Sequence, residues 1–357
     1  MNLNLRQNCK YNLAVPTSMG VRITPVDYGM VQNSNMYRMQ ATSAETNVLN
    51  VSASLGKNTL ALTTFVKDSP IASFIKGELR RRNINYLGVD VPQGGPWGYR
   101  HQFNIADTGY GLRGPRVCND RSGEVGQTLN INDFDLNQIF NVDGVQVLHI
   151  SGLIAAISEN TSNFCVELAK FAKKSGTIIS FDLNYRASFW QGRKESLRTA
   201  FTKIAELSDI LIGNEEDFQL ALGINGPVVG GENINIEEFK ELMTCVRKAF
   251  PNVKVFCDTL RVVKNVNEHY WGALTSFNDE VMVIEPRPIP VLDRIGGGDG
   301  FVGGFLYGVI CGFDLEKATQ FGWATGVLAA SSLDDAATCA DEEQVWNIWK
   351  GNARVKR

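Results

Sequence analysis

Apolar and polar positions follow two alternating periods along the second half of the chain. Short apolar runs typical of buried strands are each followed by a longer segment whose apolar residues recur at helical spacing. The predicted strands are 145–150, 177–183, 209–212 and 253–257. The predicted helices are 161–174, 193–207, a segment between Asn214 and Gly223, and 236–250. Strands that alternate with helices predict βαβ units, and hence a sheet with helices on both faces.

Capping residues support these helix boundaries. Gly176 lies just past the helix at 161–174, where glycine commonly ends a helix. Asn214 is a typical N-cap, and the acidic residues at 215–217 suit the positive end of the helix dipole. Gly223 then ends that helix.

The remaining elements lie at the two ends of the chain. Segments 270–274 and 281–284 predict a hairpin, and 298–311, 315–331, 44–55 and 71–83 predict helices. Residues 88–133 are rich in Gly, Pro and aromatics without a helical pattern. Segments 21–24, 98–105 and 116–119 are candidate strands of a small accessory sheet. We therefore expect one domain over 1–357, an α/β body with a β flap.

Composition narrows the class of protein. Lys and Arg total 35 against 38 Asp and Glu, so the net charge of −3 gives no support to nucleic-acid or membrane-surface binding. The chain has neither an apolar run long enough to span a bilayer nor a signal-peptide pattern at its start. Its seven cysteines are scattered without any CxxC, which favours free thiols in a reducing cytoplasm over disulfides or a zinc site. Small-molecule chemistry in the cytoplasm is the expectation.

The most informative segment is 292–308, LDRIGGGDGFVGGFLYG, where three glycines precede Asp299 and an apolar helix. Glycines at a helix start expose backbone N–H groups, and with the helix dipole they form an anion site suited to phosphate. A carboxylate beside such a site can accept the proton of an attacking hydroxyl, which makes Asp299 a candidate general base. The alternative is that Asp299 simply caps a buried helix.

Other phosphate-binding motifs are missing from the sequence. Gly56-Lys57 is followed by Asn58 and does not complete a G-x4-GK[ST] loop, and no G-x-G-x-x-G follows a strand of the first βαβ unit. The sequence therefore lacks the fingerprint loop of a dinucleotide-dependent oxidoreductase.

Four segments carry a resemblance to a known family. They are GGGDGF at 296–301, FDLNYR at 181–186, IGNEED at 212–217 and AETN at 44–47. Together they resemble the PfkB/ribokinase family of carbohydrate kinases, and over nearly the whole chain they are most similar to its 2-keto-3-deoxygluconate kinase branch. The resemblance implies a Rossmann-like α/β body with a β-sheet lid, with lid strands within about 16–40 and 92–121. It also implies ATP, Mg²⁺ and a homodimer formed through the lid.

The resemblance assigns roles at the phosphate end. Asp299 matches the catalytic base, and Gly296, Gly297 and Gly298 match the anion hole for the transferred phosphoryl group. The remaining matches are Asn184 near the phosphates, Asn214 and Asp217 acting on Mg²⁺ and phosphate through water, and Thr259 and Arg261 at the nucleotide. From the residues alone, Asn214 and Asp217 are equally well explained as an N-cap and a first-turn acid.

At the substrate end the resemblance points to Ser43, Asn119, Arg121, Arg186 and Asp335. The guanidinium of Arg186 can bind a carboxylate bidentately, which suits an acidic sugar, although a surface salt bridge would also explain it. Asp335 lies where the branch has a substrate-contacting acid, and the neighbouring Asp334 is the other candidate for that position.

Several positions depart from the branch. Thr42-Ser43 replace a glycine pair that contacts the sugar, Asn119-Asp120-Arg121 replaces Tyr-Asp-Arg, and Glu124-Val125 replaces Ser-Ala. The phosphate end is thus kept and the sugar end rewritten, and we expect Thr42 and Ser43 to put hydroxyls into the sugar space.

The leading hypothesis is an ATP-dependent kinase for a sugar or sugar acid, with Asp299 as general base. The identity of the sugar stays open. The second hypothesis is a catalytically weak or inactive relative that binds a sugar or nucleotide as a regulator.

Overall fold

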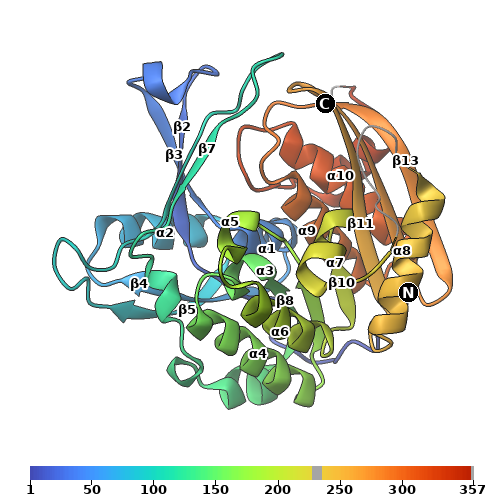
Figure 1. The fold of residues 1–357 in the computed structure, drawn as a ribbon, viewed down its shortest axis with the longest axis horizontal. Helices are drawn as coiled ribbons and strands as arrows, with labels where there is room; N and C mark the ends of the chain where they lie inside the picture. The colour runs from blue at the N-terminus through green and yellow to red at the C-terminus, as the bar shows by residue number, and fades with distance from the viewer. Residues whose placement is uncertain (227–234, 355–357) are drawn as a thin grey trace.

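The computed structural model describes residues 1–226 and 235–354. Within these residues, nine strands form a large sheet and four form a small one, and the small sheet projects from the body of the molecule (Figure 1). The order of the large sheet is β13-β12-β11-β10-β9-β8-β1-β4-β5. Its strands from β11 to β5 are parallel, and β12 runs antiparallel between β11 and β13.

The strands of the large sheet are β1 (Tyr11–Pro16), β4 (Thr59–Val66), β5 (Asn85–Val91), β8 (Val145–Ser151), β9 (Ile178–Asp182), β10 (Ile210–Ile212), β11 (Val255–Asn265), β12 (Glu268–Phe277) and β13 (Glu280–Pro290). The small sheet has the order β3-β2-β6-β7 and consists of β2 (Gly20–Pro25), β3 (Tyr37–Thr42), β6 (Phe103–Ala106) and β7 (Val117–Asp120).

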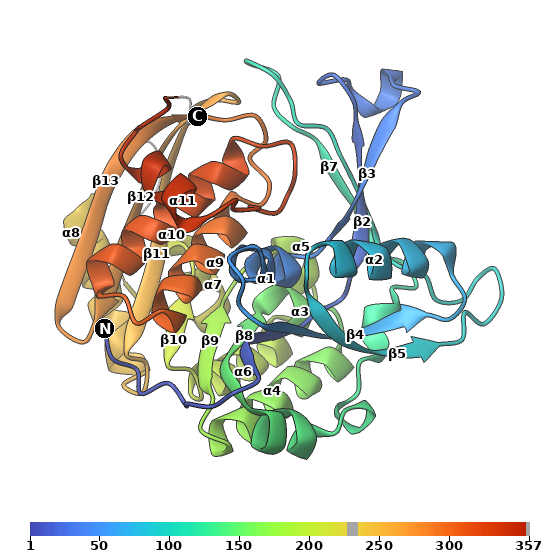
Figure 2. The ribbon, with the colours of Figure 1, turned by 180° about the vertical axis from the view of Figure 1, so that it is seen from behind.

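Helices cover both faces of the large sheet. One face carries α1 (Ala44–Ser54), α2 (Pro70–Arg81), α9 (Gly297–Ile310), α10 (Leu315–Ala330) and α11 (Glu342–Trp349) (Figure 2). The other carries α3 (Gly152–Ala155), α4 (Glu159–Lys174), α5 (Ala187–Trp190), α6 (Lys194–Ala205), α7 (Glu215–Leu222) and α8 (Ile236–Ala249). Short helical turns are η1 (Val31–Asn33), η2 (Val125–Thr128), η3 (Ile131–Asp133) and η4 (Asn137–Gly144).

Alternate residues of each central strand contribute to two separate hydrophobic cores. Ile210 and Ile212 of β10 face the core under α9 and α10, whereas Leu211 faces the core under α6 and α8. A parallel sheet covered on both faces needs apolar residues at every position, which is why these strands are continuous apolar runs in the sequence.

The predicted α/β body with a second small sheet is confirmed, and the helix boundaries largely agree. Asn214 is the N-cap of α7, and Gly223 ends it with a φ of +70°. Three strands of the large sheet, β1, β4 and β5, lie outside the predicted elements. Some predictions are wrong in extent. The strand expected at 98–105 begins only at Phe103, and the one expected to end at residue 257 runs on to Asn265. The hairpin strands expected at 270–274 and 281–284 extend over Glu268–Phe277 and Glu280–Pro290.

A buried ion-pair network ties the small sheet to the body. Arg22 on β2 is fully buried, and its guanidinium pairs with Asp293 at 2.6 Å and with Asp335. Both carboxylates belong to segments that flank α9 and α10, on the opposite side of the junction. Charges removed from water this completely persist only because they satisfy one another.

We predict that Arg22→Met destabilises the fold by about 3–5 kcal/mol, because it leaves Asp293 and Asp335 as uncompensated buried carboxyls. The free energy of unfolding in urea measures this. The matched control is Lys170→Met, which removes an exposed cation paired with Glu167 and should cost about 1 kcal/mol or less. Equal losses in the two variants would show that the network does not hold the small sheet.

Candidate active site

A cavity of about 520 Å³ lies between the small sheet and the carboxyl ends of β9 and β10. Every predicted site residue except Gly297 lines it. The lining comes from both sheets and from the start of α9, so segments distant in sequence meet at one place. In parallel α/β sheets this edge is where ligands bind.

Asp299 lies in the first turn of α9, at the cavity. Its carboxylate oxygen Oδ2 accepts a hydrogen bond of 2.9 Å from Nδ2 of Asn47 on α1. The N-cap of α9 is Gly296, with no side-chain capping bond, so the alternative that Asp299 caps the helix is wrong. Its carboxyl is held by another helix and is directed toward the cavity.

The surroundings of Asp299 favour its protonated form. Desolvation raises the pKa of Asp299 to about 7, and the charges of Glu45 and Asp335 act in the same direction, while the Asn47 hydrogen bond and Arg186 act in the opposite direction. Glu45 is itself buried, and desolvation raises its pKa too. A carboxyl with a pKa near neutrality is suited to accept and release a proton at physiological pH.

The structure requires glycine at two of the three positions before Asp299. Gly296 has a φ of +85°, and a Cβ there would lie 1.8 Å from the backbone oxygen of Asp335. Gly297 is buried outside the cavity lining, and a Cβ on it would lie 2.3 Å from the ring of Trp271. Gly298 faces open space, since a Cβ there would meet no atom within 4 Å, and its backbone is exposed at the cavity.

Asn214 and Asp217 form a reciprocal capping box at the start of α7. The side chain of Asn214 accepts from the N–H of Asp217, and Oδ2 of Asp217 accepts from the N–H of Asn214, both at 2.9 Å. Oδ1 of Asp217 also accepts from the N–H of Tyr185 at 3.1 Å. The pair therefore caps α7, as the alternative from the sequence expects. Both residues also line the cavity.

The turn after β9 contributes two more predicted residues. Asn184 is buried with a φ of +40°, and its Oδ1 has no hydrogen-bond partner among the described residues. Arg186 is exposed in the cavity, and the structure gives it a hydrogen bond of 2.8 Å to the carbonyl of Tyr185 but no ion pair within the described ranges. The alternative of a surface salt bridge for Arg186 has no support in those residues.

Thr259 and Arg261 lie within β11 and not beyond its end, because the strand predicted to end at residue 257 continues to Asn265. They pair with Ala273 and Trp271 of β12, and both line the cavity on the side of α9. β11 and β12 thus form an extended wall at this end of the site.

The small sheet covers the opposite end of the cavity with polar groups. Asn119 on β7 lies opposite Asn104 on β6, and both line the cavity. Nη1 of Arg121 donates to Oε1 of Glu124 at 2.7 Å, and its guanidinium lies 5.2 Å from the ring centroid of Phe189. Part of the positive charge of Arg121 is thereby neutralised by Glu124.

Asp335, and not Asp334, lines this cavity. Its Oδ1 pairs with Arg22, and its Oδ2 accepts a 2.9 Å hydrogen bond from the hydroxyl of Thr42. The hydroxyl of Ser43 caps α1 by accepting from the N–H of Thr46. Both Thr42 and Ser43 line the cavity as expected, yet their hydroxyls bond to the protein and do not stand free in the sugar space.

Several polar residues at or near the cavity were not among the predicted site residues, including Glu45, Asn47, Asp182 and Arg22. Glu45 and Asn47 lie in the AETN segment and Asp182 in FDLNYR, so those motifs could have identified them. Desolvation, with the charges of Asp217 and Asp299, raises the pKa of Asp182 well above its usual value. Arg22 carries no signal in the sequence that sets it apart from a surface arginine.

Three further features concern membrane-spanning helices, metal-binding clusters and cysteine pairing. No helix in residues 1–226 and 235–354 is long and apolar enough to cross a membrane. Over the same ranges, no three His, Cys, Asp or Glu side chains gather into a metal-binding cluster. All seven cysteines are free.

Comparisons with known proteins agree with this arrangement. A model of the pfkB family carbohydrate kinases matches residues 22–342. The 2-dehydro-3-deoxygalactonokinase of Haloferax volcanii is 24% identical over 342 residues, which are 94% of this chain and 96% of that protein. The crystal structure of a Thermotoga maritima 2-dehydro-3-deoxygluconokinase has a TM-score of 0.85 and 25% identity, covering 96% of this chain and 98% of that one. An Escherichia coli structure described as a putative ribokinase II in complex with ATP and Mg²⁺ has a TM-score of 0.74 and 17% identity, covering 96% and 99%.

We predict that Asp299→Asn is more stable than the wild type at about pH 8 and that this difference vanishes near pH 4. The folded-state pKa of about 7 exceeds the ordinary value of 3.8, so ionisation of Asp299 costs the folded state stability as the pH rises between these values. Asparagine does not ionise and avoids that cost. Urea unfolding of the variant and the wild type at both pH values measures the difference in their free energies of unfolding.

The control for this experiment is Asp279→Asn, which changes a fully exposed carboxylate and should leave the difference near zero. If Asp299→Asn were the less stable protein at pH 8, the carboxylate would support the fold and would not be a strained group at a site.

Proposed function

Because the chain belongs to the pfkB family of carbohydrate kinases, we propose that it transfers the γ-phosphoryl group of ATP to a hydroxyl of a keto-deoxy sugar acid, with Asp299 as general base. One observation carries the proposal: a carboxyl with a pKa of about 7 lies at the start of α9, held by Asn47, inside a cavity of about 520 Å³. A base and the positive end of the α9 helix dipole thus lie together at the cavity.

Asp299 accepts the proton of the sugar hydroxyl as that oxygen attacks phosphorus. The Asn47 hydrogen bond fixes Oδ2, which leaves Oδ1 as the oxygen available to the substrate. General-base catalysis of this kind accelerates a reaction by about 10²–10⁴. The elevated pKa brings the basicity of the carboxyl closer to that of the hydroxyl it deprotonates.

The start of α9 fits a phosphate. Its first N–H groups have no acceptor within the helix, and Gly298 leaves the backbone open to the cavity. These amides would stabilise the negative charge that develops on the transferred group. The proposal assigns Asn184, Thr259 and Arg261 to the nucleotide side, since all three line the same cavity.

Mg²⁺ supplies positive charge to the phosphates when it is bound. Both oxygens of Asp217 already accept backbone hydrogen bonds, at 2.9 and 3.1 Å, which fixes the carboxylate at the cavity. A carboxylate oxygen can accept more than one hydrogen bond, so Asp217 can still hold a water of the ion's hydration shell. The residues present therefore fit a role through water, as proposed for Asn214 and Asp217.

An acidic acceptor is supported by the arginines of the cavity that form no ion pair among the described residues, Arg186 and Arg294. Arg186 has no carboxylate partner among the described residues, whereas Arg121 shares its charge with Glu124. We therefore assign the acceptor's carboxylate to Arg186. Two of the proteins named above, from Haloferax volcanii and Thermotoga maritima, are described as kinases of dehydro-deoxy sugars. Ser43, Asn119 and Asp335 complete the proposed substrate end.

The proposal includes a homodimer formed through the small sheet and a cytoplasmic location. Large apolar side chains are exposed on β3, namely Tyr37 and Met39, and Met36 precedes them. An exposed apolar sheet face is a common protein contact. Reduced cysteines, including the exposed Cys118, accord with the cytoplasm.

An inactive, sugar- or nucleotide-binding relative is the second candidate. It is favoured by one observation: both oxygens of Asp335 are already bonded, to Arg22 and to Thr42. ATP-dependent turnover of a sugar acid would distinguish an active kinase from an inactive relative.

We predict that Asp299→Asn lowers kcat by about 10²–10⁴, because the amide cannot accept the hydroxyl proton. The affinity for ATP should change much less, since Asp299 is assigned to the acceptor. Coupled assays of ADP release with a panel of keto-deoxy sugar acids measure kcat, and calorimetry measures nucleotide binding. Turnover of the variant within about threefold of the wild type would contradict the role of the base.

We also predict that Arg186→Lys raises KM for an acidic sugar, because an ammonium loses the bidentate guanidinium contact. The expected cost is about 1–3 kcal/mol, or roughly 5- to 150-fold. The neutral alcohol analogue of the same sugar serves as the internal control, and its KM should not change. Equal effects on both substrates would place the carboxylate elsewhere in the cavity.

A further inference from the structure

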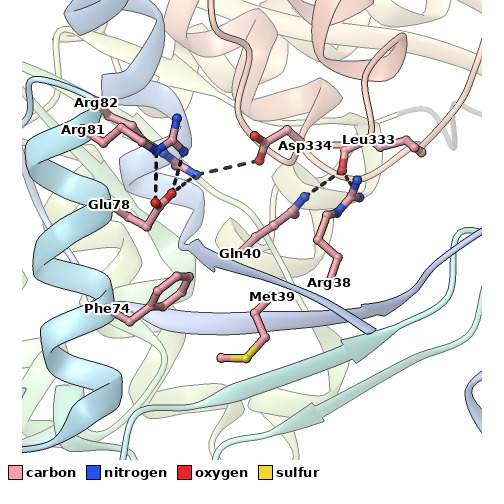
Figure 3. A pocket seen from close by; sticks show the side chains of 9 residues that line it. All are labelled: Arg38, Met39, Gln40, Phe74, Glu78, Arg81, Arg82, Leu333 and Asp334. Atoms are coloured by element: carbon pink, nitrogen blue, oxygen red, sulfur yellow. Dashed lines mark hydrogen bonds and ion pairs between the residues drawn. The ribbon is translucent and has the colours of Figure 1, made fainter. Parts of the chain in front are cut away.

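A second cavity, of about 340 Å³, lies where α2, β3 and the loop after α10 meet (Figure 3). It opens beside the junction of the small sheet and the body, outside the cavity that contains Asp299. Three of its lining residues are arginines: Arg38 from β3, and Arg81 and Arg82 from the end of α2. Glu78 and Asp334 are its acids, so the lining carries one excess positive charge.

The arginines differ in how well they are neutralised. Arg81 pairs with Glu78 through two hydrogen bonds of 3.0 and 2.6 Å, and both Arg81 and Arg82 suit the negative end of a helix dipole. Arg38 belongs to the small sheet and has no such role. It donates to the backbone carbonyl of Leu333 and has no carboxylate partner within the described ranges.

Burial makes this arrangement costly without a ligand. The side chain of Arg82 is only 6% exposed, and its ion pairs with Glu78 and Asp334 are both 3.8 Å long, beyond hydrogen-bond distance. Burial lowers the pKa of Arg82, although the nearby acids act in the opposite direction. Nε of Arg38 and Oε1 of Gln40 are buried at the cavity with no hydrogen-bond partner in the described structure.

We propose that this cavity binds a small oxyanion that also carries a hydroxyl group, with Arg38 and Arg82 contacting its phosphate or carboxylate and Oε1 of Gln40 accepting from the hydroxyl. Arginine forks match both kinds of oxyanion. The unpartnered acceptor on Gln40 requires a donor, which a bare inorganic anion other than a protonated phosphate does not supply. The cavity is large enough for a phosphorylated or carboxylated metabolite of a few carbons.

The cavity is connected to the active site through two short segments. Asp334 lines it and Asp335 lines the active-site cavity, so adjacent residues of one loop face the two spaces. On β3, Gln40 lies two residues before Thr42, whose hydroxyl donates to Asp335. A ligand that joins Arg38 to Arg82 would fix both segments, and, if the proposed function holds, would lower KM for the sugar.

Calorimetric titration of the full chain at constant ionic strength tests the binding without turnover. Inorganic phosphate, glycerol 3-phosphate and citrate are the probes, and their comparison distinguishes phosphate from carboxylate recognition. We expect Arg38→Gln and Arg82→Gln each to weaken binding of the preferred probe at least tenfold. Arg80→Gln is the matched control, because Arg80 is exposed on α2 outside the cavity and carries the same charge.

Thermal melts check that each variant is folded. If Arg82→Gln does not fold, Arg38→Gln alone still tests the proposal. The proposal is overturned if the wild type binds none of the probes at millimolar concentration, or if both variants bind them as the wild type does. It is also overturned if the variants change only the oligomeric state, which would identify the cavity as a protein contact.

The link to the active site has its own readout. At saturating ATP, the preferred probe should lower KM for the sugar by about fivefold in the wild type and leave it unchanged in Arg38→Gln. An unchanged KM in the wild type would overturn the link, and a protein with no turnover would contradict the proposed function while the binding result stood.

Discussion

The buried pairing of Arg22 with Asp293 and Asp335 fixes the relation between the two sheets. The active-site cavity exists only because the small sheet stands over the carboxyl ends of the large one, and this ion-pair network is a fully buried polar link across that junction. It also fixes the carboxylate of Asp335 at the cavity, since Asp335 is bonded to Arg22 and to Thr42. Removing charges from water to this extent is tolerated because each charge has a partner.

The site concentrates carboxyl groups where the dielectric is low. Glu45, Asp182 and Asp299 all have raised pKa values, each chiefly through desolvation. The first turn of α9 and the guanidinium of Arg186 are positive groups that offset this. Such a collection of strained acids lowers stability, which is the usual relation between a functional site and the fold that carries it.

Adjacent residues of the chain face different environments in the structure. Asp334 faces the arginine-lined cavity while Asp335 faces the active site, and the peptide bond between them joins the two. The glycines before Asp299 show the same pattern: a backbone oxygen excludes a side chain at Gly296, an indole ring excludes one at Gly297, and the backbone at Gly298 stays open. Packing therefore requires glycine at the first two of these identical positions and not at the third.

The sequence by itself determined the α/β body and the small sheet, because helical and strand periods are local properties. The glycine-rich turn before Asp299 could be read as an anion site in the same way, whereas the other segments of the cavity were identified by their resemblance to pfkB kinase motifs. It did not predict β1, β4 or β5, of which only β5 is exposed and carries a weak pattern. The extension of β11 past residue 257 was missed because it depends on pairing with β12. Only the tertiary structure decided that Asn47 holds Asp299, that Arg22 is buried, and that the hydroxyl of Thr42 is bonded to Asp335. These contacts join residues up to hundreds of positions apart, and burial, charge pairing and pKa arise from such long-range contacts, which no local pattern encodes.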